Sequence, residues 1–261
     1  MKGYHGRLLE VDLSARRMTE IPLSEEFLKK FIGGASLAAA LVFDRVGEDR
    51  DPFAPERPLI MATGPFTGTP LPMVSRYAVG GISPLTGFWG EATSGGRFPF
   101  RLKGAGWDGL LVTGKADRPV VLYLKEGKAE IRDASHLWGK DSYQTQAALK
   151  DELGDPSASV ACIAAPGEKR ARYASIMNDK GRAAGRCGLG ALMGSKNLKA
   201  VAASGNLRPE WADGGKVRDL ARKALAMING NLVSVAFREY GTMMYTDMAM
   251  TLGDAPAKYF T

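Results

Sequence analysis

Cations and glycines are interleaved from Glu168 to Lys199, in the segment EKRARYASIMNDKGRAAGRCGLGALMGSKNLK. The segment holds eight Lys or Arg residues and two acids, so its net charge is +6 (8 − 2) of the chain's +7. Glycine permits positive φ and close backbone approach, so that successive N–H groups can form an anion-binding nest. Arg adds a planar fork that matches phosphate. The pattern favours phosphate binding, and a solvated basic loop is the alternative.

Two earlier segments could meet this one, GPFTGTPLPMVSRYAV at 64–79 and SPLTGFWGEATSGG at 83–96. Each contains Thr-Gly after Pro-x, which is typical of a tight turn. A ligand-binding interpretation is that their hydroxyl and backbone N–H groups line a polar ligand. Neither segment is a Walker loop or a Rossmann fingerprint, so the sequence does not support a mononucleotide P-loop.

Composition narrows the class of protein. Hydrophobic residues make up 45% and charged residues 24% of the 261 residues, as in ordinary globular proteins of one or two domains. No apolar run approaches the ~20 residues of a membrane span, and the N-terminus has no secretory h-region. Two cysteines provide neither a disulfide framework nor a self-contained zinc or Fe–S site, so we expect a reducing cytoplasm. Nucleic-acid binding is a weaker alternative because the cations lie among glycine turns and not along a helix face.

The first two-thirds of the chain is predicted to consist mainly of short strands. Apolar-rich or alternating segments bounded by Gly, Pro, Asp or Lys predict strands at 7–13, 18–21, 59–62, 110–113, 120–124, 129–132 and 159–164. Glu126-Gly127 predicts a hairpin turn between two of them.

Two helices are expected within this β-rich region. Ser24 can cap the first helix, which falters at Gly33-Gly34 and continues through alanine-rich 36–46. Asp141 can cap the second, with Gln144 at the capping-box position and Gly154 after its end.

After Pro209 the pattern becomes helical. Apolar residues from Val217 to Ile228 follow a helical period that ends at Asn229-Gly230, and another helix is expected near Thr242. The sequence therefore predicts an α+β protein, with a β-rich domain at 1–207 and the beginning of a helical domain at 208–261.

A weak internal echo would be explained by two β-rich halves related by a pseudo-two-fold axis. Arg76-Tyr77-Ala78-Val79 recurs as Arg172-Tyr173-Ala174-Ser175. Each copy is followed by a glycine-rich segment with a Lys ahead of an apolar strand, at 94–114 and 185–205. Chance among common residue types is the competing explanation.

An ordered series of motifs resembles the N-terminal part of the tungsten-containing aldehyde:ferredoxin oxidoreductase family. The series is GYHGRLLEVDLS, GPFTGT, SPLTGF, SGG, LKGAGWDGLLVTGKA, EIRDASHLWGK, ASIMNDKGRAAGR and GALMGSKNLKAVA, over residues 3–205. This resemblance implies a two-sheet domain that carries a bis-pterin tungsten (or molybdenum) cofactor, with Mg²⁺ between the pterin phosphates. It also implies oxidation of an aldehyde to a carboxylic acid, with ferredoxin as electron acceptor.

The resemblance assigns cofactor-binding roles to individual residues. Arg76 matches an arginine between pterin and Fe–S cluster, and the backbone carbonyl of Ala183 would face Mg²⁺. Thr93 stands where several relatives have Asn as the other Mg²⁺ contact, so a carbonyl would have to serve there. The remaining positions match the glycine pair and the GRAAGR loop around the phosphates: Ser94, Gly95, Gly96, Arg182, Gly185 and Arg186.

Several residues invite a chemical role that we do not assign. Cys187 beside the arginines could be a reactive thiol, but a packed small side chain is the expected reading. We interpret His136 as structural, and His5 has no partner that the sequence identifies.

The family's Fe–S cysteines are absent from this sequence. We therefore expect a fragment or a short subunit, inactive alone, whose [4Fe–4S] cluster comes from missing C-terminal domains or from a separate subunit in a homo- or hetero-oligomer. The alternative is a non-catalytic module that binds a phosphate ligand or assists assembly.

Overall fold

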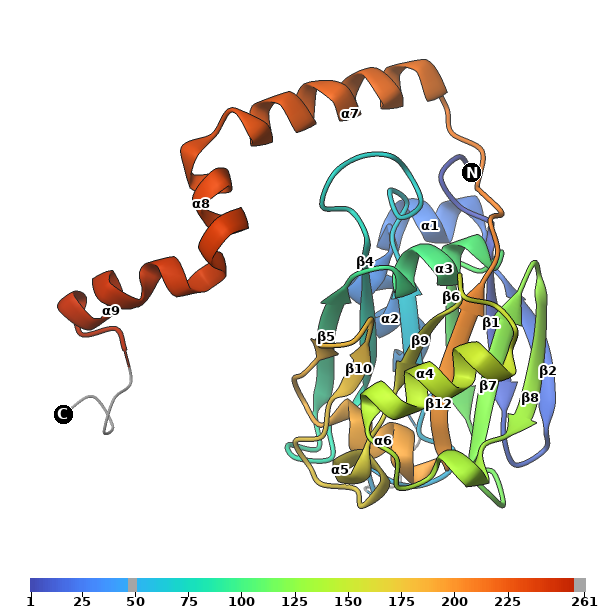
Figure 1. The fold of residues 1–261 in the computed structure, drawn as a ribbon. Coiled ribbons are helices and arrows are strands. Elements are labelled where there is room, and N and C mark those ends of the chain that lie inside the picture. The colour runs from blue at the N-terminus through green and yellow to red at the C-terminus, as the bar shows by residue number, and fades with distance from the viewer. Residues whose placement is uncertain (47–50, 256–261) are drawn as a thin grey trace. The chain divides into compact units, whose positions relative to one another are not determined.

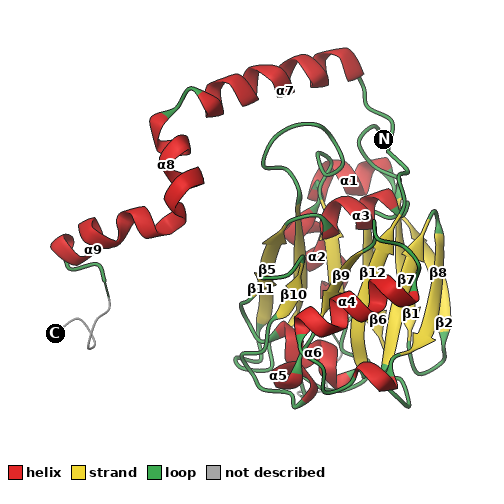
Figure 2. Cartoon of the chain, in the orientation of Figure 1, coloured by secondary structure: helices red, strands yellow, loops and turns green. Residues whose placement is uncertain are grey.

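Two six-stranded mixed sheets are the framework of the first 204 residues in the computed structural model, which describes residues 1–46 and 51–255 (Figure 1, Figure 2). The first sheet contains β1 (Arg7–Asp12), β2 (Arg17–Pro22), β3 (Leu59–Thr63), β4 (Arg76–Ile82), β5 (Trp89–Gly95) and β6 (Gly109–Thr113). The second contains β7 (Val120–Lys125), β8 (Lys128–Asp133), β9 (Ser159–Cys162), β10 (Ile176–Asn178), β11 (Arg182–Ala184) and β12 (Leu198–Ser204). The strand orders are β2-β1-β6-β3-β4-β5 and β11-β10-β9-β12-β7-β8.

The two sheets have the same topology, which confirms the predicted pair of β-rich halves. The strand pairs β1–β6 and β7–β12 are parallel, and every other neighbouring pair is antiparallel. The echo lies at equivalent places, since Arg76 begins β4 and the segment 172–175 directly precedes β10. The environments differ, however, because Tyr77 is buried and Tyr173 is exposed.

Helices cover the outer face of each sheet, and two further helices contribute to the core between the sheets. The helical elements of this region are α1 (Glu25–Phe31), α2 (Gly34–Phe43), α3 (Phe98–Gly104), η1 (Ser135–Leu137), α4 (Ser142–Glu152), α5 (Ala165–Glu168) and α6 (Leu189–Ser195). The predicted caps are confirmed, since Ser24 accepts a hydrogen bond from Phe27 N and Asp141 forms a capping box with Gln144. The predicted hairpin turn at Glu126-Gly127 is also confirmed by the pairing of β7 with β8.

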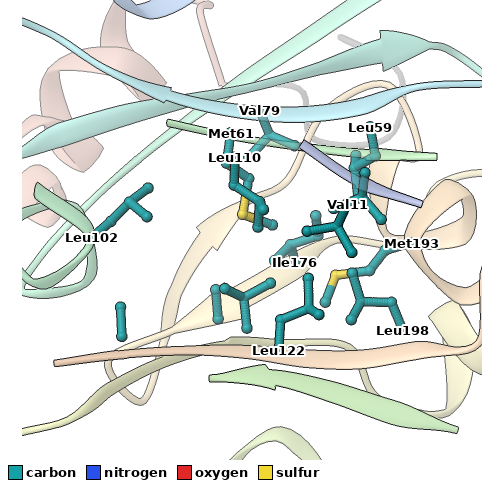
Figure 3. Close-up of a cluster of buried hydrophobic side chains, with 14 of the residues drawn as sticks. Val11, Leu59, Met61, Val79, Leu102, Leu110, Leu122, Ile176, Met193 and Leu198 are labelled. Atoms are coloured by element: carbon teal, nitrogen blue, oxygen red, sulfur yellow. The ribbon is translucent and has the colours of Figure 1, made fainter. Parts of the chain in front are cut away.

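Strand β3 shows how the layers are filled. Its Leu59 and Met61 belong to the central core between the sheets, whereas Ile60 and Ala62 pack in the cluster that includes α2. All five residues of β3 are buried because both faces of the sheet are covered. Figure 3 shows the central core, to which both sheets, α3 and α6 contribute the labelled side chains Val11, Leu59, Met61, Val79, Leu102, Leu110, Leu122, Ile176, Met193 and Leu198.

Strands β4 and β5, at 76–82 and 89–95, were not predicted from the sequence. Glycine here makes room for neighbouring side chains. A Cβ on Gly80 would lie 2.8 Å from Trp89 Cζ2, and one on Gly81 would lie 2.6 Å from Leu192 Cδ2. Strands β10 and β11 and helices α3, α5 and α6 were likewise not predicted.

The polypeptide divides into two compact units, residues 1–69 with 73–212 and residues 70–72 with 213–261. Up to residue 255, the second unit contains α7 (Gly214–Asn229), α8 (Leu232–Tyr240), η2 (Gly241–Tyr245) and α9 (Thr246–Leu252). A helical stretch begins near Thr242 as expected, since η2 starts at Gly241 and runs into α9, whereas α8, capped by Asn231, was not predicted. The assignment of 208–261 to the beginning of a larger helical domain stays a prediction. No helix among the described residues has the length and apolar character that a membrane span requires.

Two lysines of the basic segment 168–199 are buried and not solvated. The Lys199 side chain is 0% exposed and its ammonium lies 2.5 Å from Glu168 Oε1. Lys196 Nζ donates instead to backbone carbonyls, at 2.9 Å from Pro55 O and 3.4 Å from Gly114 O. Burial therefore lowers the Lys196 pKa to about 7, although Glu56 and Asp12 oppose the shift. The segment is a hairpin, a helix and a strand, and these two cations are not available to a phosphate ligand or to nucleic acid.

We expect Lys196→Met to remove a pH dependence of stability. The ordinary lysine pKa is 10.5 and the folded value is about 7, so between these values the unfolded state binds more protons. Folding stability consequently rises with pH across that window, by about 1–2 kcal/mol between about pH 7 and about pH 8.5. Urea denaturation across that range measures the slope.

The matched control is Lys115→Met, because Lys115 is exposed near the same carbonyl of Gly114. It should keep the wild-type slope. Parallel slopes for wild type and Lys196→Met would show that the buried amine does not titrate there.

Candidate functional site

One end of the β4–β5 hairpin gathers five of the residues that the sequence singled out. Antiparallel register places Arg76 opposite Gly95 and Ala78 opposite Thr93. Arg76 Nη1 lies 3.4 Å from Thr93 Oγ1, a long hydrogen bond that joins the two strands at the surface. Ser94 points inward and is buried, whereas Arg76 and Thr93 are exposed. Gly96 directly follows β5.

Arg182 comes to the same place from the other sheet. It begins β11, which is paired with β10 through the register Asn178↔Arg182. A Cβ built on Gly95 would lie 3.8 Å from Arg182 Nη1 and 4.0 Å from Arg76 Cγ. A Cβ on Gly96 would lie 2.7 Å from Arg182 Cδ. The structure therefore brings Arg76, Arg182 and the glycine pair together, and any larger side chain at Gly96 would displace the arginine.

The remaining predicted residues continue along the β11 segment. Ala183, Gly185 and Arg186 are exposed. Among the described residues, no side-chain hydrogen bond or ion pair joins them to β4 or β5. The SPLTGF turn does not join the site, because its register pair Ile82↔Trp89 is at the opposite end of the hairpin from Arg76↔Gly95.

Arg76, Arg182 and Arg186 have no acidic partner within residues 1–46 and 51–255. Other surface cations do find one, as Arg7 does with Glu20 and Arg118 with Asp133. Two guanidinium groups flank Gly95, and neither forms an ion pair with a carboxylate of the described residues, so a positive potential remains that an anion would neutralise. Arg also offers the fork geometry that binds phosphate or carboxylate through paired hydrogen bonds.

A buried polar cluster holds the two sheets together behind these arginines. Asn178 Oδ1 accepts hydrogen bonds from Ser94 Oγ at 2.7 Å and from Tyr77 OH at 3.3 Å, while its Nδ2 donates to Gly95 O at 2.9 Å. Burial, reinforced by the negative charge of Asp179, raises the pKa of Tyr77 and keeps its hydroxyl protonated. Asn178 was not singled out from the sequence, although it directly precedes the DKGRAAGR motif.

A cavity of about 280 Å³ opens beside Arg76 and Thr93. Its lining is mostly backbone and small side chains, from Ile32, Gly33, Gly34, Ala35, Gly64, Pro65, Phe66, Thr67, Val74, Arg76, Tyr77, Ala78 and Thr93. Gly33 is required where α2 meets the end of β3, because a Cβ there would lie 2.8 Å from Thr63 O. The GPFTGT segment therefore does border the arginine site.

The Thr67 hydroxyl is not available as a ligand, contrary to the ligand-binding interpretation of GPFTGT. It is buried and lies 3.4 Å from the carbonyls of Val74 and Arg76, its acceptors within the loop. In SPLTGF, Ser83 Oγ accepts from the N–H groups of Leu85 and Thr86, so that segment is the tight turn.

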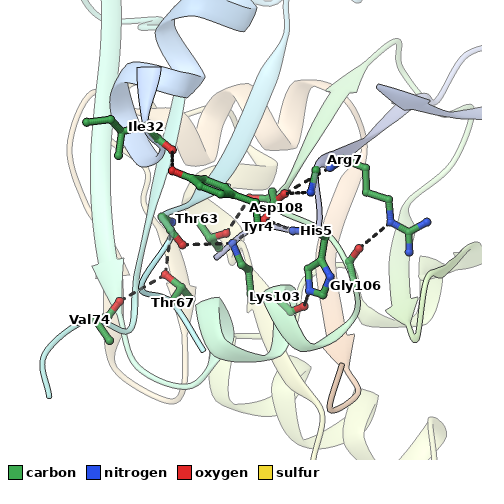
Figure 4. A network of polar contacts seen from close by, with 12 residues as sticks. Tyr4, His5, Arg7, Ile32, Thr63, Thr67, Val74, Lys103, Gly106 and Asp108 are labelled. Atoms are coloured by element: carbon green, nitrogen blue, oxygen red, sulfur yellow. Dashed lines mark hydrogen bonds and ion pairs between the residues drawn. The ribbon is translucent and has the colours of Figure 1, made fainter. Parts of the chain in front are cut away.

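A buried ion pair supports the cavity wall from below (Figure 4). Lys103 Nζ lies 2.6 Å from Asp108 Oδ1 and 3.3 Å from Gly64 O, and both charged side chains are 1% exposed. The second Asp108 oxygen accepts a hydrogen bond from Gly6 N at 2.7 Å. Tyr4 OH donates to Ile32 O at 2.6 Å. Two carbonyls of cavity-lining residues are thereby fixed to the interior.

The histidines and Cys187 take structural positions. His5 Nε2 lies 2.9 Å from Lys103 O, and burial is the main cause that lowers its pKa. His136 is exposed and pairs with Glu152 at 2.7 Å. Cys187 is half-buried against the central core, as expected.

The β-rich part of this chain matches a known protein family. A family model described as aldehyde ferredoxin oxidoreductase, N-terminal domain, matches residues 8–205. The tungsten-containing aldehyde ferredoxin oxidoreductase of Pyrococcus abyssi (strain GE5 / Orsay) is 42% identical over 261 residues, which cover 100% of this chain and 43% of that protein. The aliphatic sulfonate oxidoreductase, WOR-like subunit, of Pyrococcus furiosus is 36% identical over 258 residues, covering 93% of this chain and 40% of that protein.

A solved structure shows the same fold. The active site complex BamBC of benzoyl coenzyme A reductase, in complex with 1,5-dienoyl-CoA, contains a chain that aligns with a TM-score of 0.84 and 37% identity. The alignment covers 87% of this chain and 35% of that one. This chain thus spans less than half the length of the proteins that it matches.

We expect Lys103→Met to destabilise the fold strongly. The substitution leaves the Asp108 carboxylate buried without its counter-charge, a change that typically costs about 3–5 kcal/mol. Chemical denaturation of the purified chain measures the loss. Lys29→Met is the control, since Lys29 forms an exposed i,i+4 pair with Glu25 whose loss should change stability by about 0.5 kcal/mol or less. Equal stability of the two variants would mean that the buried pair is dispensable.

Proposed function

Because this chain belongs to the aldehyde ferredoxin oxidoreductase family, we propose that it forms the cofactor-binding base of a tungsten- or molybdenum-containing oxidoreductase. The bound group would be a bis-pterin cofactor together with Mg²⁺. When bound, such a centre supplies the two-electron chemistry that oxidises an aldehyde to a carboxylic acid, with ferredoxin as acceptor. The chain itself supplies binding and orientation.

The observation that carries this proposal is the pair of arginines beside Gly95. Arg76 and Arg182 come from different sheets, flank one glycine and lack acidic partners among the described residues. Gly95 has no side chain, so its backbone can approach a flat or phosphorylated ligand, whereas Gly96 leaves room for the side chain of Arg182. A group with several negative charges fits this set of donors, and a neutral ligand would leave the guanidinium groups uncompensated.

Each residue has a defined task in this proposal. Arg76, Arg182 and Arg186 would donate hydrogen bonds to phosphate oxygens and balance their charge. The backbone carbonyls of Thr93 and Ala183 would bind Mg²⁺, which prefers oxygen ligands. Arg76 Nη1 already lies near the Thr93 hydroxyl, so the first arginine and the first metal contact are neighbours.

Electrons would leave through an Fe–S cluster whose cysteine ligands lie outside this sequence. Cys162 is fully buried, and burial raises the pKa of its thiol to about 12, so it remains a thiol at neutral pH. Cys187 alone cannot hold a [4Fe–4S] cluster, which takes four thiolates. We propose that the rest of a longer polypeptide, or a separate subunit in a homo- or hetero-oligomer, supplies the cluster and the ferredoxin contact in the cytoplasm.

We expect Arg182→Ala in the complete enzyme to reduce cofactor retention more than fold stability. The side chain is exposed, so truncation removes little packing, whereas each charge-assisted hydrogen bond to phosphate contributes about 1.5–3 kcal/mol. Metal and pterin content per protein, together with thermal unfolding, measure the two effects. Arg182→Lys should restore binding only partly, because an ammonium cannot form the fork.

Arg16→Ala is the control, because Arg16 lies on an exposed turn and should change neither quantity. If Arg182→Ala keeps full cofactor content but unfolds at lower temperature, the arginine is structural and the proposed phosphate contact is rejected.

We also expect the isolated chain to show no aldehyde-dependent dye reduction. With two cysteines it cannot assemble a four-thiolate cluster, so no chain of redox centres leads away from the metal. Spectrophotometric assay of the purified chain, with metal and pterin quantified in the same sample, tests this expectation. Turnover without an added subunit would refute the proposal that another segment or subunit must supply the Fe–S cluster.

A further inference from the structure

We propose that Asp179 is a positioning residue that holds Arg182 against the glycine pair and so fixes the two halves of the anion site at one separation. This inference rests on the proposed function, since it concerns how the same site is held in shape. Asp179 is an acid beside a basic site and would by simple charge count oppose anion binding. Its contacts indicate the opposite effect.

The Asp179 carboxylate is an acceptor for four neutral donors from three separate segments. Oδ2 accepts hydrogen bonds from Arg97 N at 2.5 Å, Phe98 N at 2.9 Å and Asn178 Nδ2 at 2.9 Å. Oδ1 accepts from Ser159 Oγ at 2.5 Å. Neutral donors thus occupy the carboxylate, and no ion pair forms between Asp179 and Arg182. The acid anchors the turn without neutralising the nearby guanidinium.

The backbone of this turn requires such an anchor. Asp179 and Lys180 both have positive φ, 46° and 72°, a region that side chains other than glycine rarely adopt. Gln146 Oε1 on α4 accepts a hydrogen bond from Lys180 N at 2.9 Å. Two side chains thus hold an unfavourable backbone conformation that ends two residues before Arg182. Without the carboxylate, the turn has less to oppose its relaxation toward negative φ.

Gly96 leaves the space in which the Asp179 carboxylate and the Arg182 side chain lie near each other. A Cβ built at Gly96 would lie 3.2 Å from Arg182 Nε and closer still to Asp179 Oδ2, so both side chains occupy the space that glycine leaves open. Asp179 also binds the two N–H groups that follow Gly96, at Arg97 and Phe98. One side chain therefore fixes the glycine pair and the start of the arginine hairpin to each other.

The test is binding of inorganic pyrophosphate to the purified full chain, measured by titration calorimetry in a double-mutant cycle of Asp179 with Arg182. Asp179→Ala should weaken binding by about tenfold, and Asp179→Asn should weaken it less. In an Arg182→Ala background neither change should alter affinity by more than about twofold, because the effect passes through Arg182. Should Asp179→Ala fail to fold, Asp179→Asn carries the cycle.

The direction of the effect separates positioning from simple electrostatics. Removing a negative charge beside a cationic site should strengthen anion binding if charge alone matters. Asp133→Asn is the control, because it makes the same charge change at a carboxylate that accepts from Ser135 far along the second sheet. It should leave pyrophosphate affinity unchanged.

The outcomes distinguish the positioning role of Asp179 from the proposed contact between Arg182 and phosphate. Tighter binding by Asp179→Asn, or equal losses in the presence and absence of Arg182, overturns the positioning role. If the wild type does not bind pyrophosphate, or if Arg182→Ala binds as tightly as the wild type, the proposed phosphate contact itself is rejected.

Discussion

The buried amide of Asn178 is the interaction on which the site depends. Its oxygen accepts from Ser94 and Tyr77 of the first sheet. Its nitrogen donates to Gly95 O, also in the first sheet, and to Asp179 in the turn between β10 and β11. A buried amide that lost these partners would pay a desolvation penalty of about 1–3 kcal/mol for each group left unpaired. The set of contacts is directional, so it specifies one alignment of the two sheets where apolar packing alone would permit several. The surface arginines inherit their spacing from that alignment.

Much of the architecture could be predicted from the sequence because local signals agreed with the fold. The caps at Ser24 and Asp141 and the turn at Glu126-Gly127 follow from short-range hydrogen bonding and backbone preference, which need no knowledge of distant segments. Strands β4 and β5 were not predicted, because glycines such as Gly80 and Gly90 are typical of turns. In the structure their missing Cβ atoms admit Trp89 and Cys187, a reason that exists only after the chain has folded.

The site divides in the same way. Residue type and spacing identified Arg76, Arg182 and the glycine pair. An exposed arginine is charged and accessible in the folded protein, as its residue type alone suggests. Charge alone did not reveal that Lys103, in the last turn of α3, and Lys196, directly after α6, are buried. The first has a carboxylate partner and the second has only carbonyls, a difference that depends on residues far along the chain. Asp179 was overlooked for the same reason.

Each sheet is formed by one continuous stretch of the sequence, and this affects how the chain folds during translation. The first sheet is complete once Thr113 is made, whereas the second requires the chain up to Ser204. In the interval, roughly 90 residues or about 5–20 s of translation, the inner face of the first sheet has no partner to cover it. Val11, Leu59 and Leu110 would then be open to the surroundings of the ribosome. A nascent chain of this fold should therefore depend on chaperones more than the stability of the finished protein would suggest.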